Sequence, residues 1–89
     1  SPYFIEVDLQ KDIEKSIAAL PEKRQEIFRL SREEGLKYRE ISEKLNISVK
    51  TVETQMRLAI QTLREKLSKY LWKKQDNLPD AMRKREHFL

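Results

Sequence analysis

The chain has 89 residues, of which 38% are charged, and its formal net charge is +4 at neutral pH. With no cysteine, one glycine and one histidine, it excludes structural disulfides, glycine-rich phosphate loops and histidine-based nucleophilic or metal sites. No apolar run approaches the roughly 20 residues that span a bilayer, so we expect a single-domain cytoplasmic binding protein with no cofactor, enzymatic activity or membrane segment.

The first predicted helix covers residues 8–19, with Asp8 as its N-cap. Its apolar residues recur at helical spacing, which predicts one buried stripe. The stripe consists of Leu9, Ile13, Ile17 and Leu20. We interpret residues 1–7 as the remnant of a linker.

The second predicted helix covers residues 21–34. Pro21 has the preset φ of a first helical position, and Gly35 can adopt the left-handed conformation that ends a helix. The residues predicted to face the core are Arg24, Ile27, Phe28 and either Leu30 or Ser31.

A short helix over residues 38–45 is joined by a tight turn to a long helix that runs to about residue 71. Asn46 follows the short helix where a left-handed residue is needed, Ile47 points back to the core, and Ser48 is a good N-cap. Both helices have one apolar stripe. The sequence therefore predicts an all-α, small four-helix domain over residues 8–71 that contains a helix-turn-helix and no winged elements.

Positive charge is concentrated in the second half of the chain. Residues 1–47 carry nine Lys and Arg against ten Asp and Glu, whereas residues 48–89 carry ten against five. This distribution favours a polyanionic partner for the long helix. We interpret residues 72–89 as a basic C-terminal tail, and its composition is compatible with disorder, with docking through Trp72 and Phe88, or with contact to a partner.

In a helix-turn-helix, the second helix lays its N-terminal half in the major groove of DNA. The residues opposite the apolar stripe of that helix are Lys50, Glu53, Thr54, Arg57 and Gln61. Arg57 can pair with guanine, Glu53 can accept from cytosine, and Thr54 can contact a thymine methyl group or a phosphate. The residues expected to hold phosphate are Ser48, Lys50, Thr51 and, from the preceding helix, Arg39.

The segments "LPEKRQEIF", "GLKYREISEKLNIS" and "TVETQMRLA", in this order within residues 19–67, closely resemble region 4 of the sigma-70 family, in particular its extracytoplasmic-function group. The resemblance implies recognition of the −35 element in double-stranded promoter DNA through the second helix of the motif. It also implies that the domain holds the flap-tip helix of the RNA polymerase β subunit, and that an anti-sigma factor can hold the protein inactive.

Two departures from this family bear on function. The family often has Arg or Lys where this chain has Glu53, and Arg where it has Ile60, so we expect the chain to read an element other than the commonest one. The family's region 2 is absent from these residues. We therefore interpret the chain as an excised domain or a fragment that could not start transcription by itself.

Two other functions remain open at this stage. One is the helix-turn-helix output domain of a response regulator, which dimerises through its last helix, whereas an isolated region 4 domain should stay monomeric. The other is a protein-interaction module that binds no DNA. In either a sigma domain or an interaction module, we expect Phe28 and Leu36 to contact the protein partner.

Overall fold

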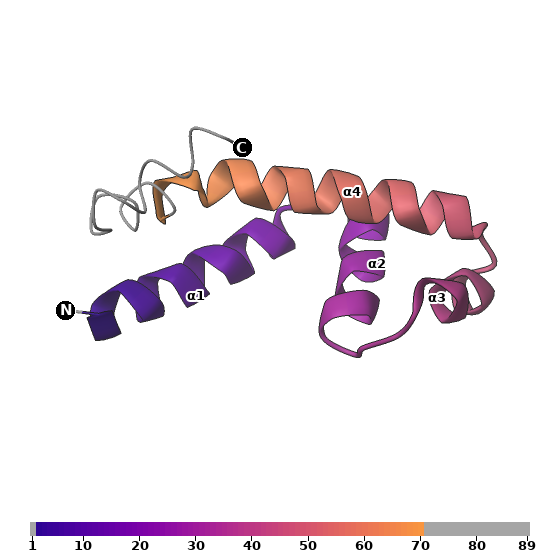
Figure 1. The fold of residues 1–89 in the computed structure, drawn as a ribbon, viewed down its shortest axis with the longest axis horizontal. Helices are drawn as coiled ribbons and strands as arrows, with labels where there is room; N and C mark the ends of the chain where they lie inside the picture. The colour runs from indigo at the N-terminus through magenta and orange to yellow at the C-terminus, as the bar shows by residue number, and fades with distance from the viewer. Residues whose placement is uncertain (1, 71–89) are drawn as a thin grey trace, which may run out of the picture.

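A computed structural model describes residues 2–70 of the chain, with side chains from residue 7 onward. These residues form helices α1 (Pro2–Ala18), α2 (Glu22–Arg32), α3 (Tyr38–Leu45) and α4 (Val49–Lys66), with no strand among them. Helix α4 is the centre of the fold, because each of the other three contacts it: α1 runs along its C-terminal half, α2 crosses it, and α3 lies beside its N-terminal end (Figure 1). The prediction of an all-α domain with a helix-turn-helix is confirmed.

The core forms where α1, α2 and α3 meet α4, and every helix contributes to it. Its buried apolar residues are Ile17, Leu20, Ile27, Phe28, Leu30, Ile41, Val52, Met56 and Ala59. Burying one large aliphatic side chain contributes about 1.5–3 kcal/mol. Burial of this cluster therefore stabilises the packing of the two helices of the helix-turn-helix against α2.

Helix α1 begins at Pro2, so the predicted start at residue 8 is wrong, and Asp8 lies within the helix instead of capping it. A proline in the first turn has no N–H group to leave unpaired, and its φ already suits a helix. Residues 2–7 already belong to the helix, so Asp8 does not cap it, although aspartate is a favourable N-cap residue. The interpretation of residues 1–7 as a linker remnant stays a prediction.

Helix α2 is shorter than predicted at both ends. Pro21 is its N-cap and not its first residue, and the helix ends at Arg32. Gly35 adopts a φ of 72°, in the left-handed region as predicted. The chain then turns so that the amide of Leu36 donates to the carbonyl of Leu30 at 3.0 Å.

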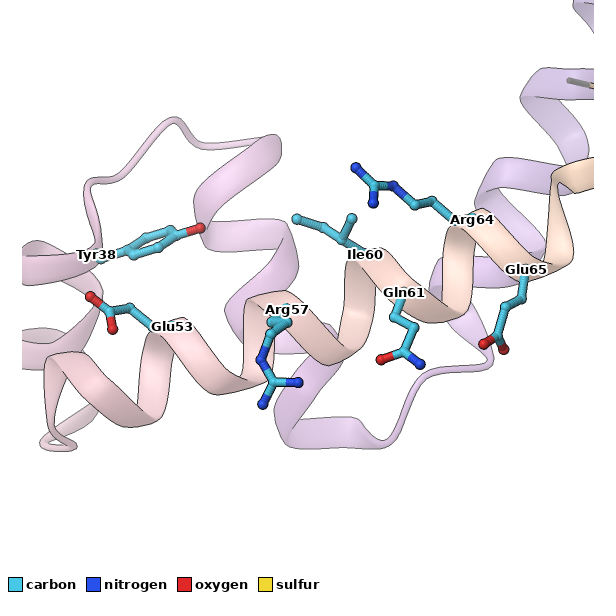
Figure 2. Close-up of a pocket in the computed structure, with 7 residues that line it drawn as sticks. All are labelled: Tyr38, Glu53, Arg57, Ile60, Gln61, Arg64 and Glu65. Atoms are coloured by element: carbon cyan, nitrogen blue, oxygen red, sulfur yellow. The ribbon is translucent and has the colours of Figure 1, made fainter. Parts of the chain in front are cut away.

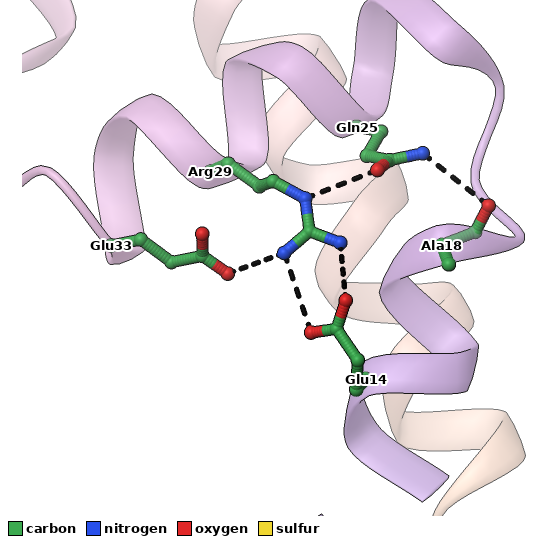
Figure 3. Close-up of polar contacts among 5 residues, drawn as sticks. All are labelled: Glu14, Ala18, Gln25, Arg29 and Glu33. Carbon is green, nitrogen blue, oxygen red and sulfur yellow. Dashed lines mark hydrogen bonds and ion pairs between the residues drawn. The ribbon is translucent and has the colours of Figure 1, made fainter. Parts of the chain in front are cut away.

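Arg29 of α2 forms a set of polar contacts, of which the one to Glu14 links α2 to α1 (Figure 3). Its Nη2 donates to Oε1 of Glu14 at 2.7 Å, its Nη1 donates to Glu33 at 2.5 Å, and its Nε donates to Gln25 at 3.1 Å. The hydrogen bond from Arg29 lowers the pKa of Glu14, and the same bond raises the pKa of Arg29. Gln25 extends the contact by donating to the carbonyl of Ala18 at 3.3 Å.

Helix α4 ends at Lys66, earlier than predicted, because Leu67 leaves the helical conformation with φ −102° and ψ 8°. Past this point the hydroxyl of Tyr70 donates to Oδ2 of Asp12 at 2.5 Å, and Nζ of Lys69 lies 3.0 Å from the same oxygen. These contacts join the end of the described chain to α1. The tail at residues 72–89, with Trp72 and Phe88, lies outside the described residues.

Candidate nucleic-acid interface

The turn between α3 and α4 has the conformation that the sequence predicts. Asn46 is left-handed, with φ 55° and ψ 50°, and the carbonyl of Ser42 accepts from the amides of Asn46 and Ile47. Ile47 then packs against the core cluster. The left-handed Asn46 ends α3, and the packing of Ile47 against the core anchors the chain just after it. The turn therefore fixes the angle between α3 and α4.

The start of α4 is capped by side-chain hydroxyl groups. Oγ of Ser48 accepts from the amide of Thr51 at 3.0 Å, and the two hydroxyl groups share a hydrogen bond of 2.9 Å. The cap leaves the first amides of α4, those of Val49 and Lys50, without an acceptor in residues 2–70. Amides at a helix N-terminus point outward and attract anions such as phosphate.

The outer face of α4 carries the side chains predicted to reach DNA. Lys50, Glu53, Arg57 and Gln61 are exposed, and Thr54 is half-buried. They lie on the accessible part of the helix surface, whereas Val52 and Met56 of the same helix are fully buried. The predicted division of α4 into a core face and a polar face is therefore correct.

Within this face the side chains point in two directions (Figure 2). Glu53, Ile60 and Arg64 lie on the side of α4 where Tyr38 of α3 sits, whereas Arg57, Gln61 and Glu65 point to the other side. Glu53 therefore belongs to the flank next to α3 and not to the row of Arg57 and Gln61. The sequence did not distinguish the two directions, because Glu53, Arg57 and Gln61 follow one another at intervals of four residues, and this spacing places them in one row on a helical projection.

These seven residues line a shallow hollow of about 570 Å³ along α4. Sequence reasoning missed Tyr38, Arg64 and Glu65 as members of this surface. Glu65 could have been found from its spacing, since Arg57, Gln61 and Glu65 follow one another at intervals of four residues. Tyr38 could not, because its position depends on how α3 packs against α4.

The positive side chains of this face differ in their partners. Arg57, Lys50 and Arg64 form no ion pair within residues 2–70. Arg39 lies 3.7 Å from Glu43, but both side chains are largely exposed, and such pairs contribute little to stability. All four cations therefore keep a charge that can contact a polyanion.

Helix α2 supports α4 from the side through a polar contact. Nε of Arg24 donates to Oε1 of Gln55 at 2.9 Å, and both residues are half-buried. The prediction that Arg24 turns inward is confirmed. This bond links the start of α2 to the N-terminal half of α4 across 31 positions of sequence.

The two residues predicted to contact a protein partner are largely enclosed. Phe28 is 7% exposed and belongs to the core, and Leu36 is half-buried against it. An edge of Phe28 borders an apolar hollow of about 290 Å³, here called the α2–α4 groove. The groove is lined by Phe28, Arg32, Ile60, Leu63, Arg64, Leu67 and Tyr70.

Other kinds of site find little support in the part of the chain described here. No group of three or more His, Cys, Asp or Glu residues among residues 2–70 is arranged to hold a metal ion. None of the helices in this part is both long and apolar enough to cross a membrane.

Comparison with known proteins gives one match. The family model described as sigma-70, region 4 matches residues 10–63, which span the C-terminal half of α1, all of α2 and α3, and α4 as far as Leu63. No curated protein and no solved structure is detectably similar to the chain.

Proposed function

The chain belongs to the sigma-70 region 4 family, and from this premise we propose that its α4 reads the −35 element of promoters as part of an extracytoplasmic-function sigma factor. Domains of this family bind promoter DNA in transcription initiation and are not enzymes. The match includes both helices of the helix-turn-helix and favours this function over a response-regulator output domain. The observation that carries the proposal is that Arg57, on the outer face of α4, is exposed and forms no ion pair with any residue between positions 2 and 70.

The side chains of α4 have separate roles in this proposal. Arg57 pairs with a guanine, and Gln61, one turn further along the same row, contacts the next base edge. Glu53 accepts from a cytosine at the flank of the site, and Thr54 meets a thymine methyl group or a phosphate. Because base contacts specify and phosphate contacts position, Arg57, Gln61 and Glu53 determine the sequence preference, and Thr54 adds to it only where it meets a thymine methyl group.

The phosphate contacts come from the ends of the two helices. The amides at the start of α4 lie beside the exposed Ser48, Lys50 and Thr51, and Arg39 lies near the start of α3. These groups hold the DNA backbone on both sides of the reading helix. Their loss weakens binding to all sequences about equally.

The protein partner in this proposal is the β-flap of RNA polymerase core. Phe28 offers only its edge in the α2–α4 groove, and Leu36 offers the exposed part of its side chain. An anti-sigma factor is a further expected partner, and the isolated domain is expected to be a monomer. A DNA-independent interaction module would use the same apolar surface but leave the cations of α4 without a role.

Selection from a random duplex library at low salt tests the proposal. The expected result is enrichment of one motif that binds more tightly than a scrambled duplex of the same length. Lys50→Ala should then lower affinity for both duplexes and reduce the salt slope by about one. Absence of enrichment, with weak binding that only falls as salt rises, would overturn sequence-specific reading and favour the interaction module.

A further inference from the structure

Arg24 carries a charge that no acidic side chain within residues 2–70 neutralises. The side chain is half-buried, and its hydrogen bond in this part of the chain runs from Nε to Oε1 of Gln55, a neutral group. A guanidinium in this position keeps its full charge but has lost part of its hydration. An anion from outside the domain can therefore stabilise it by charge-assisted hydrogen bonds.

The pair formed by Arg24 and Gln55 still has donors to offer. Because Gln55 accepts through Oε1, its Nε2 keeps two N–H groups, and Arg24 keeps those of Nη1 and Nη2. These nitrogens have no hydrogen-bond partner among residues 2–70. Every buried side-chain nitrogen or oxygen in this part of the chain has a partner, so the unpartnered nitrogens are accessible from outside.

The pair lies on the flank of α4 that faces away from α3. Successive residues of an α-helix turn by about 100°, so Gln55 lies about 200° around α4 from Glu53, which is turned toward Tyr38 of α3. Thr51, one turn before Gln55, lies on the same flank and is exposed. A helix in the major groove has a sugar-phosphate backbone on each side. The backbone on the Thr51 side can therefore come within reach of Arg24 and Gln55.

We propose that Arg24 and Gln55 form a phosphate clamp, in which the Nη atoms of Arg24 and Nε2 of Gln55 donate to the free oxygens of one DNA backbone phosphate. The clamp rests on the proposed function, because it requires α4 to lie in the groove. The guanidinium fork matches the spacing of two phosphate oxygens, and Gln55 orients the fork by holding Nε. The clamp adds affinity without a preference for any base.

The salt dependence of DNA binding tests the clamp, measured by fluorescence anisotropy on the selected duplex and on a scrambled one. Arg24→Ala should reduce the slope of log affinity against log salt by about one on both duplexes, and should weaken binding about tenfold at low salt. Lys23→Ala is the control. It removes an exposed neighbouring cation that lies 3.3 Å from Glu26, and it should leave the slope unchanged. An unchanged slope for Arg24→Ala would overturn the proposal and leave Arg24 with a structural role alone.

Gln55→Glu separates DNA binding from stability. The carboxylate still accepts from Arg24, now in a charge-assisted bond, so the link between α2 and α4 is kept. The same change neutralises the guanidinium and removes the amide donors of the clamp. The denaturant midpoint should therefore not fall, whereas the salt slope should fall as in Arg24→Ala. A slope and affinity equal to those of the wild type would contradict the clamp.

Neutral methylphosphonate groups, placed at single backbone positions of the selected duplex, locate the clamped phosphate. At one position the substitution should weaken binding of the wild type and of Lys23→Ala, but not of Arg24→Ala. Equal weakening of all three proteins at every position would overturn the proposal. If selection enriches no motif, sequence reading fails, but the salt slope on the scrambled duplex still decides whether the clamp exists. The two failures are therefore distinguishable.

Discussion

Glu53 and Arg57 lie four positions apart on α4, yet their side chains point to different sides of the helix, and no ion pair joins them in the described part of the chain (Figure 2). Opposite charges at this spacing commonly interact on a helix surface. Here the acid is turned toward α3, and the guanidinium has no acidic partner among residues 2–70. Arg57 can therefore offer both its charge and its donors to DNA.

The position of Glu53 leads to a prediction about discrimination between DNA sequences. Glu53→Gln should raise affinity for a scrambled duplex, because it removes a negative charge beside the DNA backbone, and should reduce the preference for the selected motif. Fluorescence anisotropy on both duplexes measures the ratio. Glu34→Gln, an equal change at an exposed site outside α4, is the control, and a Glu53→Gln protein indistinguishable from it would contradict the predicted role.

The contact between Tyr70 and Asp12 predicts a pH dependence of stability. The hydrogen bond to Asp12 raises the pKa of Tyr70 from 10.0 to about 12, and the bond from Tyr70, aided by Lys69, lowers the pKa of Asp12. The stabilisation from Tyr70 is thus complete below pH 10 and is lost as pH rises toward 12. The stabilisation from Asp12 is present above its usual pKa of 3.8 and is lost as pH falls below it.

Tyr70→Phe tests this dependence. Its denaturant midpoint should lie below that of the wild type between about pH 4 and pH 10, and the difference should shrink outside this window. Unfolding followed by circular dichroism at several pH values measures it. A difference that stays constant from pH 7 to pH 12 would show that the hydroxyl contributes through packing alone.

The left-handed residue in the turn predicts an unusual order of substitutions. Asn46→Gly should leave stability nearly unchanged, whereas Asn46→Val should destabilise the protein by about 1–2 kcal/mol, because a branched side chain clashes in this conformation. Chemical denaturation of the two variants gives the comparison. Equal stabilities would mean that the turn adopts another backbone conformation in solution.

Ile41 predicts how the helix-turn-helix depends on the core. Its side chain is fully buried between α3 and the rest of the cluster, so Ile41→Ala should cost about 2–5 kcal/mol. Val49 is 39% exposed, and Val49→Ala should change stability by less than about 0.5 kcal/mol. Similar losses for both variants, measured by denaturant unfolding, would contradict this packing.

Much of the fold could be predicted because its signals are local. The apolar spacing of α3 and α4, the left-handed Asn46 and Gly35, and the cap at Ser48 each involve residues close in sequence. Such signals depend on backbone preferences that neighbouring residues determine by themselves. The helix-turn-helix is built almost entirely from them, so it was predicted correctly.

The contacts that join distant segments could not be predicted in the same way. The bonds from Tyr70 to Asp12 and from Arg24 to Gln55 cross 58 and 31 positions of sequence. They require the crossing angles of the helices, which side-chain packing decides. For the same reason, the sequence placed Glu53 and Arg57 on one face, although they point to different sides.

The binding of Arg57→Ala to the selected duplex and to its single-base variants tests most directly whether α4 reads sequence. The expected result is a loss of about 1–3 kcal/mol on the selected duplex and relaxed preference at one base position. Arg32→Ala, which removes the same charge from α2, should keep the base preference. An equal, sequence-independent loss in both variants would contradict base reading by Arg57 and leave only electrostatic attraction.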